Sequence, residues 1–144
     1  MNYENILVEY ENSVATIILN RPNVMNALNS QMRAELTDAV TRYSKEARVV
    51  VLTGSGNAFC SGQDLGDGNS LQSVDLERTL RDEYEPLIRA IVNSTVPTVT
   101  ALNGAAAGAG ANLALAADIV IAKSSAYFVP VSYTHLRAHE TPIN

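Results

Sequence analysis

The stretch Asn103–Leu115, NGAAAGAGANLAL, most constrains what this chain can fold into. It carries no charge, contains three glycines and lies between the apolar runs TVTAL and DIVIA. Such a segment can belong to a membrane helix, to a loop that holds a nucleotide phosphate, or to a sharp turn into a helix whose backbone must approach a ligand. Close packing of a helix against a strand would favour the same small residues.

The membrane alternative conflicts with the polar residues of this region. No charge occurs from Ala90 to Ala117, and Gly104 and Gly108 have the spacing of a membrane helix-pairing motif. However, Pro97, Asn103, Asn112 and several threonines interrupt the run, and its alanines and glycines are only weakly hydrophobic. We therefore expect no membrane span here.

Neither phosphate-binding motif is complete. A dinucleotide-binding G-x-G-x-x-G would use Gly108 and Gly110, but Leu113 occupies the place of the third glycine. No acidic residue that could bind a ribose lies between Asp118 and Glu140. The G-K-[ST] of a P-loop is absent from the sequence. Both nucleotide alternatives are therefore weak.

The third alternative is a turn into a helix that starts near Ala109. The first N–H groups of a helix have no partner within it and lie at the positive end of its dipole. Small side chains there would let a ligand oxygen reach these groups. A second turn with a glycine, in Asn57–Leu65 (NAFCSGQDL), also follows a buried strand. Two such turns can converge on one oxygen, which is the arrangement of an oxyanion hole.

Hydrophobic periodicity along the chain predicts an α/β fold of repeated strand–helix units. We expect a β-hairpin in residues 5–20 with its turn at Glu11-Asn12, and a buried strand in residues 48–54. TVTAL and DIVIA are two further expected strands. A helix should begin at Ser30, capped by Asn29 or Ser30 itself. A second long helix should be kinked at Pro86. The apolar residues that mark the two helices are Met32, Leu36, Val40 and Tyr43 in the first and Leu76, Leu80, Tyr84, Leu87 and Ile91 in the second.

Composition favours a globular protein of the cytoplasm. The chain has 144 residues, 47% of them hydrophobic and 17% charged, which suits one domain with its own core. A net charge of −5 without a basic cluster in the body of the chain argues against nucleic acid or an anionic membrane as a partner. The single cysteine cannot form an internal disulfide, and the N-terminus MNYENILVEY lacks the features of a signal peptide.

Three stretches, RPNVMNAL, LTGSGNAFCSGQDL and NGAAAGAGANLALAADIVIA, together resemble the N-terminal signatures of the crotonase, or enoyl-CoA hydratase/isomerase, superfamily. The resemblance runs in the right order from about Ile6 to Val129. It implies a crotonase-like spiral of ββα units, here truncated, and assembly as a homotrimer or hexamer. It also implies an acyl-CoA thioester as substrate, with no metal and no separate cofactor, because coenzyme A is part of the substrate.

By position, the resemblance implies an oxyanion hole formed by the backbone N–H groups of Gln63 and Ala109. These groups would hold the thioester carbonyl as it becomes an enolate. The implied substrate-binding positions, which include the path of the coenzyme A chain, are Val24, Ala27, Leu28, Ser61, Gly62, Gln63, Asp64, Leu65, Gly108 and Ala109.

Asn112 stands where hydratases of this superfamily have the first of two catalytic glutamates. An amide can orient water but cannot exchange a proton as a carboxylate does, so hydration by the two-glutamate route is disfavoured. GAAAGAGANLAL more closely resembles epoxyphenylacetyl-CoA isomerase-type members, whose acid lies in the later half. We therefore expect isomerase chemistry; the alternatives are a true enoyl-CoA hydratase and a non-catalytic acyl-CoA-binding member.

Other candidate groups are expected to be structural. Cys60 lies next to the proposed hole, but no histidine in the body of the chain can activate it, so we interpret it as a small packing thiol. The same lack of histidine disfavours a peptidase of the related fold. Asp64 should fix its loop or cap a helix. Asp118, between a helix and a strand, should also be structural.

The sequence changes character after Pro130, where VSYTHLRAHETPIN follows. His135 and His139 could bind a metal from one helix face, but no H-E-x-x-H and no third ligand accompany them. The segment resembles a translated sequencing-adapter peptide. We therefore interpret residues 131–144 as a non-native tail and residues 1–130 as the N-terminal part of a crotonase core domain. Such a chain would lack the later acid and be an inactive fragment.

Overall fold

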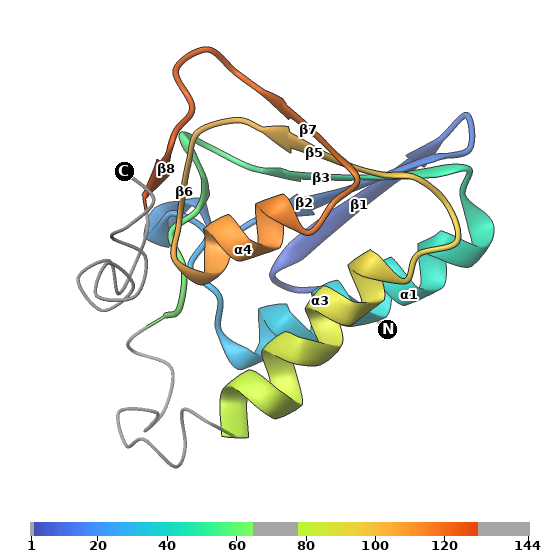
Figure 1. Ribbon diagram of the computed structural model, residues 1–144, viewed down its shortest axis with the longest axis horizontal. Helices are drawn as coiled ribbons and strands as arrows, with labels where there is room; N and C mark the ends of the chain where they lie inside the picture. The colour runs from blue at the N-terminus through green and yellow to red at the C-terminus, as the bar shows by residue number, and fades with distance from the viewer. Residues whose placement is uncertain (1, 65–77, 130–144) are drawn as a thin grey trace, which may run out of the picture.

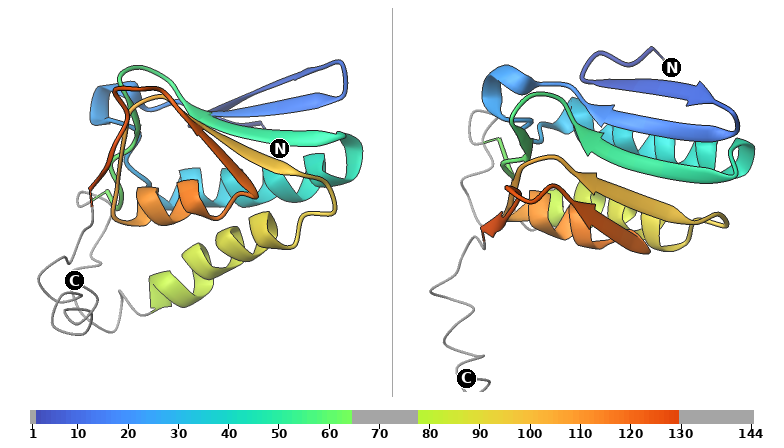
Figure 2. Two further views of the ribbon diagram at one scale, coloured as in Figure 1. Left: turned by 45° about the horizontal axis from the view of Figure 1, so that its top comes forward. Right: turned by 90° about the horizontal axis from the view of Figure 1, so that it is seen from above.

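The computed structural model describes residues 2–64 and 78–129. Its main feature is a five-stranded sheet of order β1-β2-β3-β5-β7, with the helices gathered on one face (Figures 1 and 2). The first two strands are antiparallel and the others are added in parallel, which confirms the predicted α/β layout. The strands are β1 (Ile6–Glu11), β2 (Val14–Leu19), β3 (Val49–Gly54), β5 (Thr98–Leu102) and β7 (Ile119–Ala122).

The hairpin turn lies one residue later than the sequence predicted. Glu11 is the last residue of β1 and pairs with Val14, so the loop consists of Asn12 and Ser13. Both loop residues have positive φ angles, 55° and 66°. Two residues with positive φ match the twist of a tight hairpin, and asparagine tolerates this conformation. The predicted turn at Glu11-Asn12 was therefore wrong by one position.

The helix α1 (Ser30–Glu46) begins where the sequence predicted. Of the two predicted caps, Asn29 is the one used: its side-chain oxygen accepts a hydrogen bond of 2.8 Å from the N–H of Met32. All four apolar residues that predicted this helix are buried. They form the stripe that α1 packs against the sheet.

The second predicted helix is helical throughout residues 78–92 but is not regular. A π-helical turn, η2 (Leu80–Tyr84), leads into α3 (Glu85–Val92), and Pro86 lies in the first turn of α3. Proline has no N–H and crowds the carbonyl four residues earlier in a regular helix. The turn before it is widened instead, with the N–H of Glu85 bonded to the carbonyl of Leu80, five residues back.

This widened turn explains one error in the predicted apolar face. Tyr84, Leu87 and Ile91 are buried as expected, but Leu80 is 50% exposed. The extra residue in the π-turn rotates Leu80 away from the face that the other three share. Leu76, the remaining predicted position, lies outside the described residues.

A second, small sheet was not predicted. It has three parallel strands in the order β4-β6-β8 and lies at one end of the main sheet, next to the helix α4 (Ala109–Leu115) (Figure 1). Strands this short show no alternation that a sequence pattern could reveal. Its strands are β4 (Ala58–Cys60), β6 (Ala105–Ala107) and β8 (Phe128–Val129).

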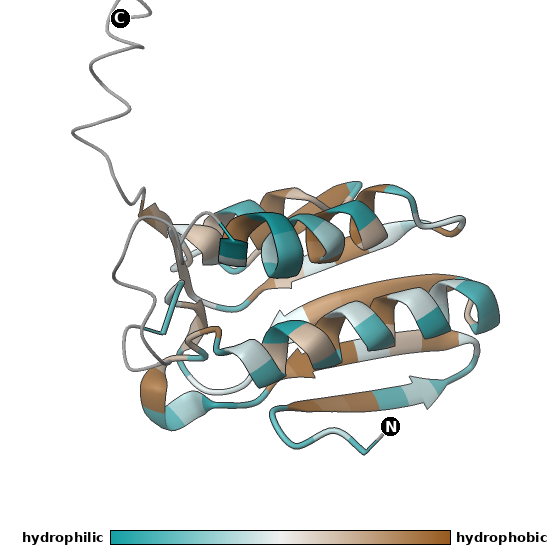
Figure 3. Ribbon diagram, turned by 90° about the horizontal axis from the view of Figure 1, so that it is seen from below, coloured by the Kyte–Doolittle hydropathy of each residue, from teal (hydrophilic) through white to brown (hydrophobic). Residues whose placement is uncertain are grey.

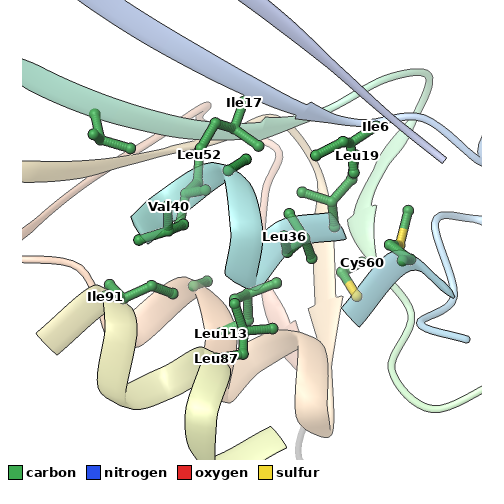
Figure 4. Packing of buried hydrophobic residues seen from close by; sticks show 14 of the residues in the cluster. Ile6, Ile17, Leu19, Leu36, Val40, Leu52, Cys60, Leu87, Ile91 and Leu113 are labelled. Carbon is green, nitrogen blue, oxygen red and sulfur yellow. The ribbon is translucent and has the colours of Figure 1, made fainter. Parts of the chain in front are cut away.

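The hydrophobic core lies between the main sheet and the three helices α1, α3 and α4. In Figure 4, Val40 of α1 lies below Ile17 and Leu52 of the sheet, and Leu113 of α4 lies beside Leu87 of α3. The helices are polar over much of the surface that faces away from this core (Figure 3). Burial of these side chains is the main favourable contribution to folding.

The uncharged region does not form a membrane helix. Residues 90–117 comprise the end of α3, β5, β6 and the seven-residue α4. Among the described residues, no helix is long and apolar enough to span a bilayer. Leu65 and residues 131–144, which include both histidines, fall outside the described part of the chain.

Candidate functional site

The turns that follow β4 and β6 touch each other through their main chains. Gly62 has a φ of +106°, and a Cβ atom there would lie 2.9 Å from the carbonyl oxygen of Ala107 and 3.7 Å from the nitrogen of Ala109. The residue just before Gln63 therefore lies against the start of α4. The two turns are neighbours, as the sequence predicted.

Close packing accounts for two of the nearby glycines. A Cβ at Gly110 would lie 2.3 Å from the carbonyl oxygen of Cys60, and one at Gly104 would lie 2.0 Å from that of Asn57. Both glycines let β6 and α4 approach β4 more closely than any side chain allows. Gly108 differs, because its φ of 54° and ψ of −121° form a backbone conformation suited to glycine.

The N–H of Gln63 faces away from the neighbouring loop. In a parallel bridge, the N–H of Leu28 donates to the oxygen of Gly62 at 2.7 Å, and the N–H of Asp64 donates to the oxygen of Leu28 at 3.0 Å. Because alternate residues of an extended segment bond to opposite sides, the N–H of Gln63 points to the other side. It donates to no backbone acceptor within residues 2–64 and 78–129.

The N–H of Ala109 is similarly available. Ala109 is the first residue of α4, so its N–H has no acceptor within the helix. No backbone carbonyl of the described segments accepts a hydrogen bond from it. By contrast, the N–H of Gly108 is used, since it donates to the oxygen of Val129 at 3.0 Å. Neighbouring turns thus present two main-chain donors, which can stabilise a developing negative charge on an oxygen.

Two asparagines, which the sequence did not mark as partners, brace the turn between β3 and β4. The buried amide of Asn26 donates hydrogen bonds of 3.0 Å to the carbonyls of Ser55 and Ala58. The amide of Asn103 donates to the same oxygen of Ala58 at 3.1 Å and to Gly56 at 3.2 Å. Asparagine is common in turns of every kind, so no sequence pattern distinguished these two residues as partners of the turn.

Asp64 fixes its loop, as predicted. Its carboxylate lies 3.0 Å from the Nη1 atom of Arg21, which also donates to the carbonyl of Ala27 at 2.5 Å. The ion pair joins the segment after β4 to the segment after β2.

Asp118 is also structural. Its carboxylate accepts a hydrogen bond of 3.0 Å from the N–H of Thr98, and this bond joins the starts of β5 and β7.

The side chain of Gln63 belongs to a buried polar network that sequence reasoning did not find. Its Oε1 accepts a hydrogen bond of 2.6 Å from the hydroxyl of Tyr84 and one of 3.5 Å from Nη1 of Arg33. Arg33 is only 2% exposed, although it lies on α1 among residues of mixed polarity. No local pattern marks an arginine as buried when three of its side-chain partners, Gln63, Glu83 and Tyr84, are 30 to 51 residues away in the sequence.

Cys60 is a packing thiol, as predicted. It is fully buried, and burial raises the pKa of its thiol to about 12, partly opposed by a hydrogen bond from the backbone of Gly62. A thiol of this kind stays protonated and unreactive at neutral pH. The described residues contain no group of three or more His, Cys, Asp or Glu side chains that could hold a metal ion.

The other predicted positions surround the two turns but differ in burial. Val24 ends a short 3₁₀ helix, η1 (Pro22–Val24), and its carbonyl accepts a hydrogen bond of 3.3 Å from the Ser61 hydroxyl. Ala27 and Leu28 are buried, so Leu28 has a structural role in pairing the loops. Asn112 is exposed on α4. Their contribution to ligand binding stays a prediction.

Comparisons with known proteins place this geometry in a family. The sequence model of the enoyl-CoA hydratase/isomerase family matches residues 9–133. A Rhodobacter capsulatus protein named "Probable enoyl-CoA hydratase" is 60% identical over 129 residues, which cover 90% of this chain and 50% of that protein. The Escherichia coli 1,2-epoxyphenylacetyl-CoA isomerase is 43% identical over 131 residues, with 88% and 50% covered. The chain thus spans about half the length of these relatives.

Solved structures confirm the fold. The Bacillus anthracis enoyl-CoA hydratase superposes with a TM-score of 0.85 at 32% identity, covering 92% of this chain and 52% of that one. The Thermoplasma volcanium enoyl-CoA hydratase gives a TM-score of 0.81 at 30% identity, covering 91% and 53%. The predicted crotonase-like fold is therefore confirmed over about half of each relative. This chain belongs to the enoyl-CoA hydratase/isomerase family.

Proposed function

We propose that the N–H groups of Gln63 and Ala109 bind the thioester carbonyl of an acyl-CoA substrate, and that the longer protein isomerises this substrate. The observation that carries the proposal is the contact of Gly62 with the start of α4, which brings the two main-chain donors into neighbouring turns. Membership of the enoyl-CoA hydratase/isomerase family supports an acyl-CoA thioester as the substrate class.

The chemical reason lies in the charge that the carbonyl oxygen acquires. When a proton leaves the carbon next to the thioester, the carbonyl becomes an enolate and its oxygen turns negative. Donors held beforehand at this oxygen stabilise the charged state more than the neutral one, so they lower the barrier to proton removal. In this proposal, a carboxylate in the second half of the longer protein moves the proton.

The isomerase form of the proposal depends on Asn112. Its exposed amide can orient a substrate group or a water but cannot act as the proton-transferring acid of a hydratase. The name of the Escherichia coli relative supports isomerisation. The second candidate is hydration, which the name of the Rhodobacter capsulatus relative favours at higher identity.

The donor pair can be tested with a chromophoric substrate analogue. A 4-(dimethylamino)cinnamoyl thioester of coenzyme A absorbs at longer wavelength when hydrogen bonds polarise its carbonyl. We expect this red shift on binding to the chain. The Ala109→Pro variant should abolish most of it, because proline deletes the N–H at the first helical position, where its ring is tolerated. The Ala109→Gly variant keeps the N–H and should retain the shift.

Loss of the red shift in both variants, or in neither, would contradict a role for the Ala109 N–H.

The choice between isomerase and hydratase is tested separately with crotonyl-CoA and the full-length protein. We expect no rapid loss of the enoyl thioester absorbance while Asn112 is present. Rapid hydration would establish the second candidate.

A further inference from the structure

We propose that Arg33 and Tyr84 are positioning residues that fix the direction of the Gln63 peptide by holding the Gln63 side chain. This inference rests on the proposed function, because it assigns the network a role in presenting the N–H of Gln63. It adds two residues, from α1 and η2, to a site otherwise made of main chain from the turn after β4 and the start of α4.

The first step is the polarity of the network. Arginine can only donate hydrogen bonds, and Nη1 of Arg33 lies 3.3 Å from the hydroxyl oxygen of Tyr84. The hydroxyl therefore accepts from Arg33 and directs its own hydrogen to Oε1 of Gln63, 2.6 Å away. Arg33 also donates to this Oε1 at 3.5 Å. Only one orientation of the Gln63 amide satisfies these donors.

The second step is the rigidity of Arg33 itself. Its guanidinium bonds Glu83 through Nε at 2.7 Å and through Nη2 at 2.6 Å, and it lies 4.8 Å from the centre of the Tyr84 ring. Burial is the largest single influence and lowers the pKa of Arg33, but the hydrogen bonds and charges of Glu83 and Tyr84 together outweigh it and raise the pKa above its usual value. The side chain is therefore a fixed, charged donor.

The third step links the guanidinium to the main chain on both sides of Gln63. Nη1 of Arg33 donates at 2.8 Å to the carbonyl of Leu28, the residue whose main chain pairs with Gly62 and Asp64. Gln63 is consequently held by its side chain and by both adjacent residues. Little freedom remains for the peptide between Gly62 and Gln63 to rotate, which keeps its N–H preorganised for a carbonyl oxygen.

The fourth step distinguishes positioning from plain stabilisation. The Nε2 atom of Gln63 is buried and has no hydrogen-bond partner among the residues the structure describes. An unsatisfied buried donor costs about as much free energy as the hydrogen bonds at Oε1 contribute. The side chain thus adds little net stability, yet it ties Gln63 to two other elements.

A double-mutant cycle tests this inference with the chromophoric thioester described above. Tyr84→Phe removes the hydroxyl but keeps the ring on Arg33. We expect the affinity for the thioester to fall about tenfold, the loss of one well-aligned hydrogen bond, together with a smaller red shift at saturation. Affinity for free coenzyme A, which has no acyl carbonyl, should change less than about twofold.

Gln63→Ala should have a similar effect on the red shift, with a melting temperature close to that of the unsubstituted chain. In the Gln63→Ala background, Tyr84→Phe should have no further effect, because its route to the peptide has been removed. Tyr3→Phe is the matched control: it loses a comparable hydroxyl bond, 2.8 Å to Asp38, and should leave the red shift unchanged.

Each outcome decides a different claim. If Tyr84→Phe leaves the red shift and affinity unchanged, or acts equally in the Gln63→Ala background, the positioning role is wrong while the donor pair stands. If the unsubstituted chain binds the thioester without any red shift, the proposed function fails and this inference fails with it. Arg33→Lys, which keeps the charge but not the fork of donors, should reproduce the Tyr84→Phe effect.

Discussion

At the scale of single residues, Gly62 joins stability and the proposed site. Its φ of +106° and a Cβ position 2.9 Å from the oxygen of Ala107 leave no room for a side chain. We expect Gly62→Ala to lower the free energy of unfolding by about 1–3 kcal/mol and to remove the thioester red shift. Gly56→Ala, at a φ of +79° but near Pro22, should cost stability without affecting the red shift. Denaturant unfolding and the spectral assay measure both effects; an unchanged red shift in Gly62→Ala would contradict the site.

Cys60 makes stability depend on pH in the alkaline range. Its thiol ionises near pH 9.0 when unfolded and near pH 12 in the folded chain. As pH rises above 9, the thiol ionises in the unfolded chain but stays protonated in the folded one. The free energy of unfolding therefore falls by about 1.4 kcal/mol per pH unit until pH 12. Between pH 8 and 10, the free energy of unfolding should therefore fall about 1.4 kcal/mol further than in Cys60→Ala. Parallel pH profiles of the two proteins would show that the thiol is not buried in solution.

At the scale of elements, the start of α1 depends on one side-chain cap. Asn29→Ala should lower the free energy of unfolding by about 1 kcal/mol, because the N–H of Met32 then loses its acceptor. Asn29→Asp keeps an acceptor at the same place, with a charge that suits a helix N-terminus, and should stay within a few tenths of a kcal/mol. Thermal or urea unfolding compares the three proteins. Equal losses of stability in both variants would contradict a capping role for the Asn29 side chain.

The same element shows what local sequence can and cannot predict. The periodic apolar residues of α1 and the alternation in β2 predicted both elements, because one face of each is buried against the other. The π-turn before Pro86 exposed Leu80 and was not visible, since a proline can be accommodated by a kink or by a widened turn. The strand β4 was missed because its pairing depends on β6, distant in the sequence.

The candidate site likewise combines features that the sequence predicted with features that it did not. Its glycine-containing turns were evident from the sequence, because glycine marks places where the backbone bends or meets another backbone. Arg33 and Tyr84 were missed as partners of Gln63, since their contacts cross between α1, η2 and a loop. Such contacts depend on how the elements pack together.

At the scale of the whole molecule, the two edges of the main sheet differ. The edge strand β7 exposes Ile119 (50%) and Ile121 (64%), and no charged residue lies within it, whereas the opposite edge strand β1 carries Glu9 and Glu11. An apolar, uncharged edge favours pairing with other chains. We expect this 144-residue chain to self-associate, as measured by sedimentation, and Ile121→Lys to reduce the association. Leu7→Lys on β1 should have little effect; an equal effect of both substitutions would argue against β7 as the contact.

A crystal structure with a bound, non-reactive acyl-CoA analogue tests the central claim most directly. The account predicts the thioester oxygen at about 2.7–3.1 Å from the nitrogens of both Gln63 and Ala109. A thioester oxygen bonded to neither nitrogen, or to only one of them, would contradict it.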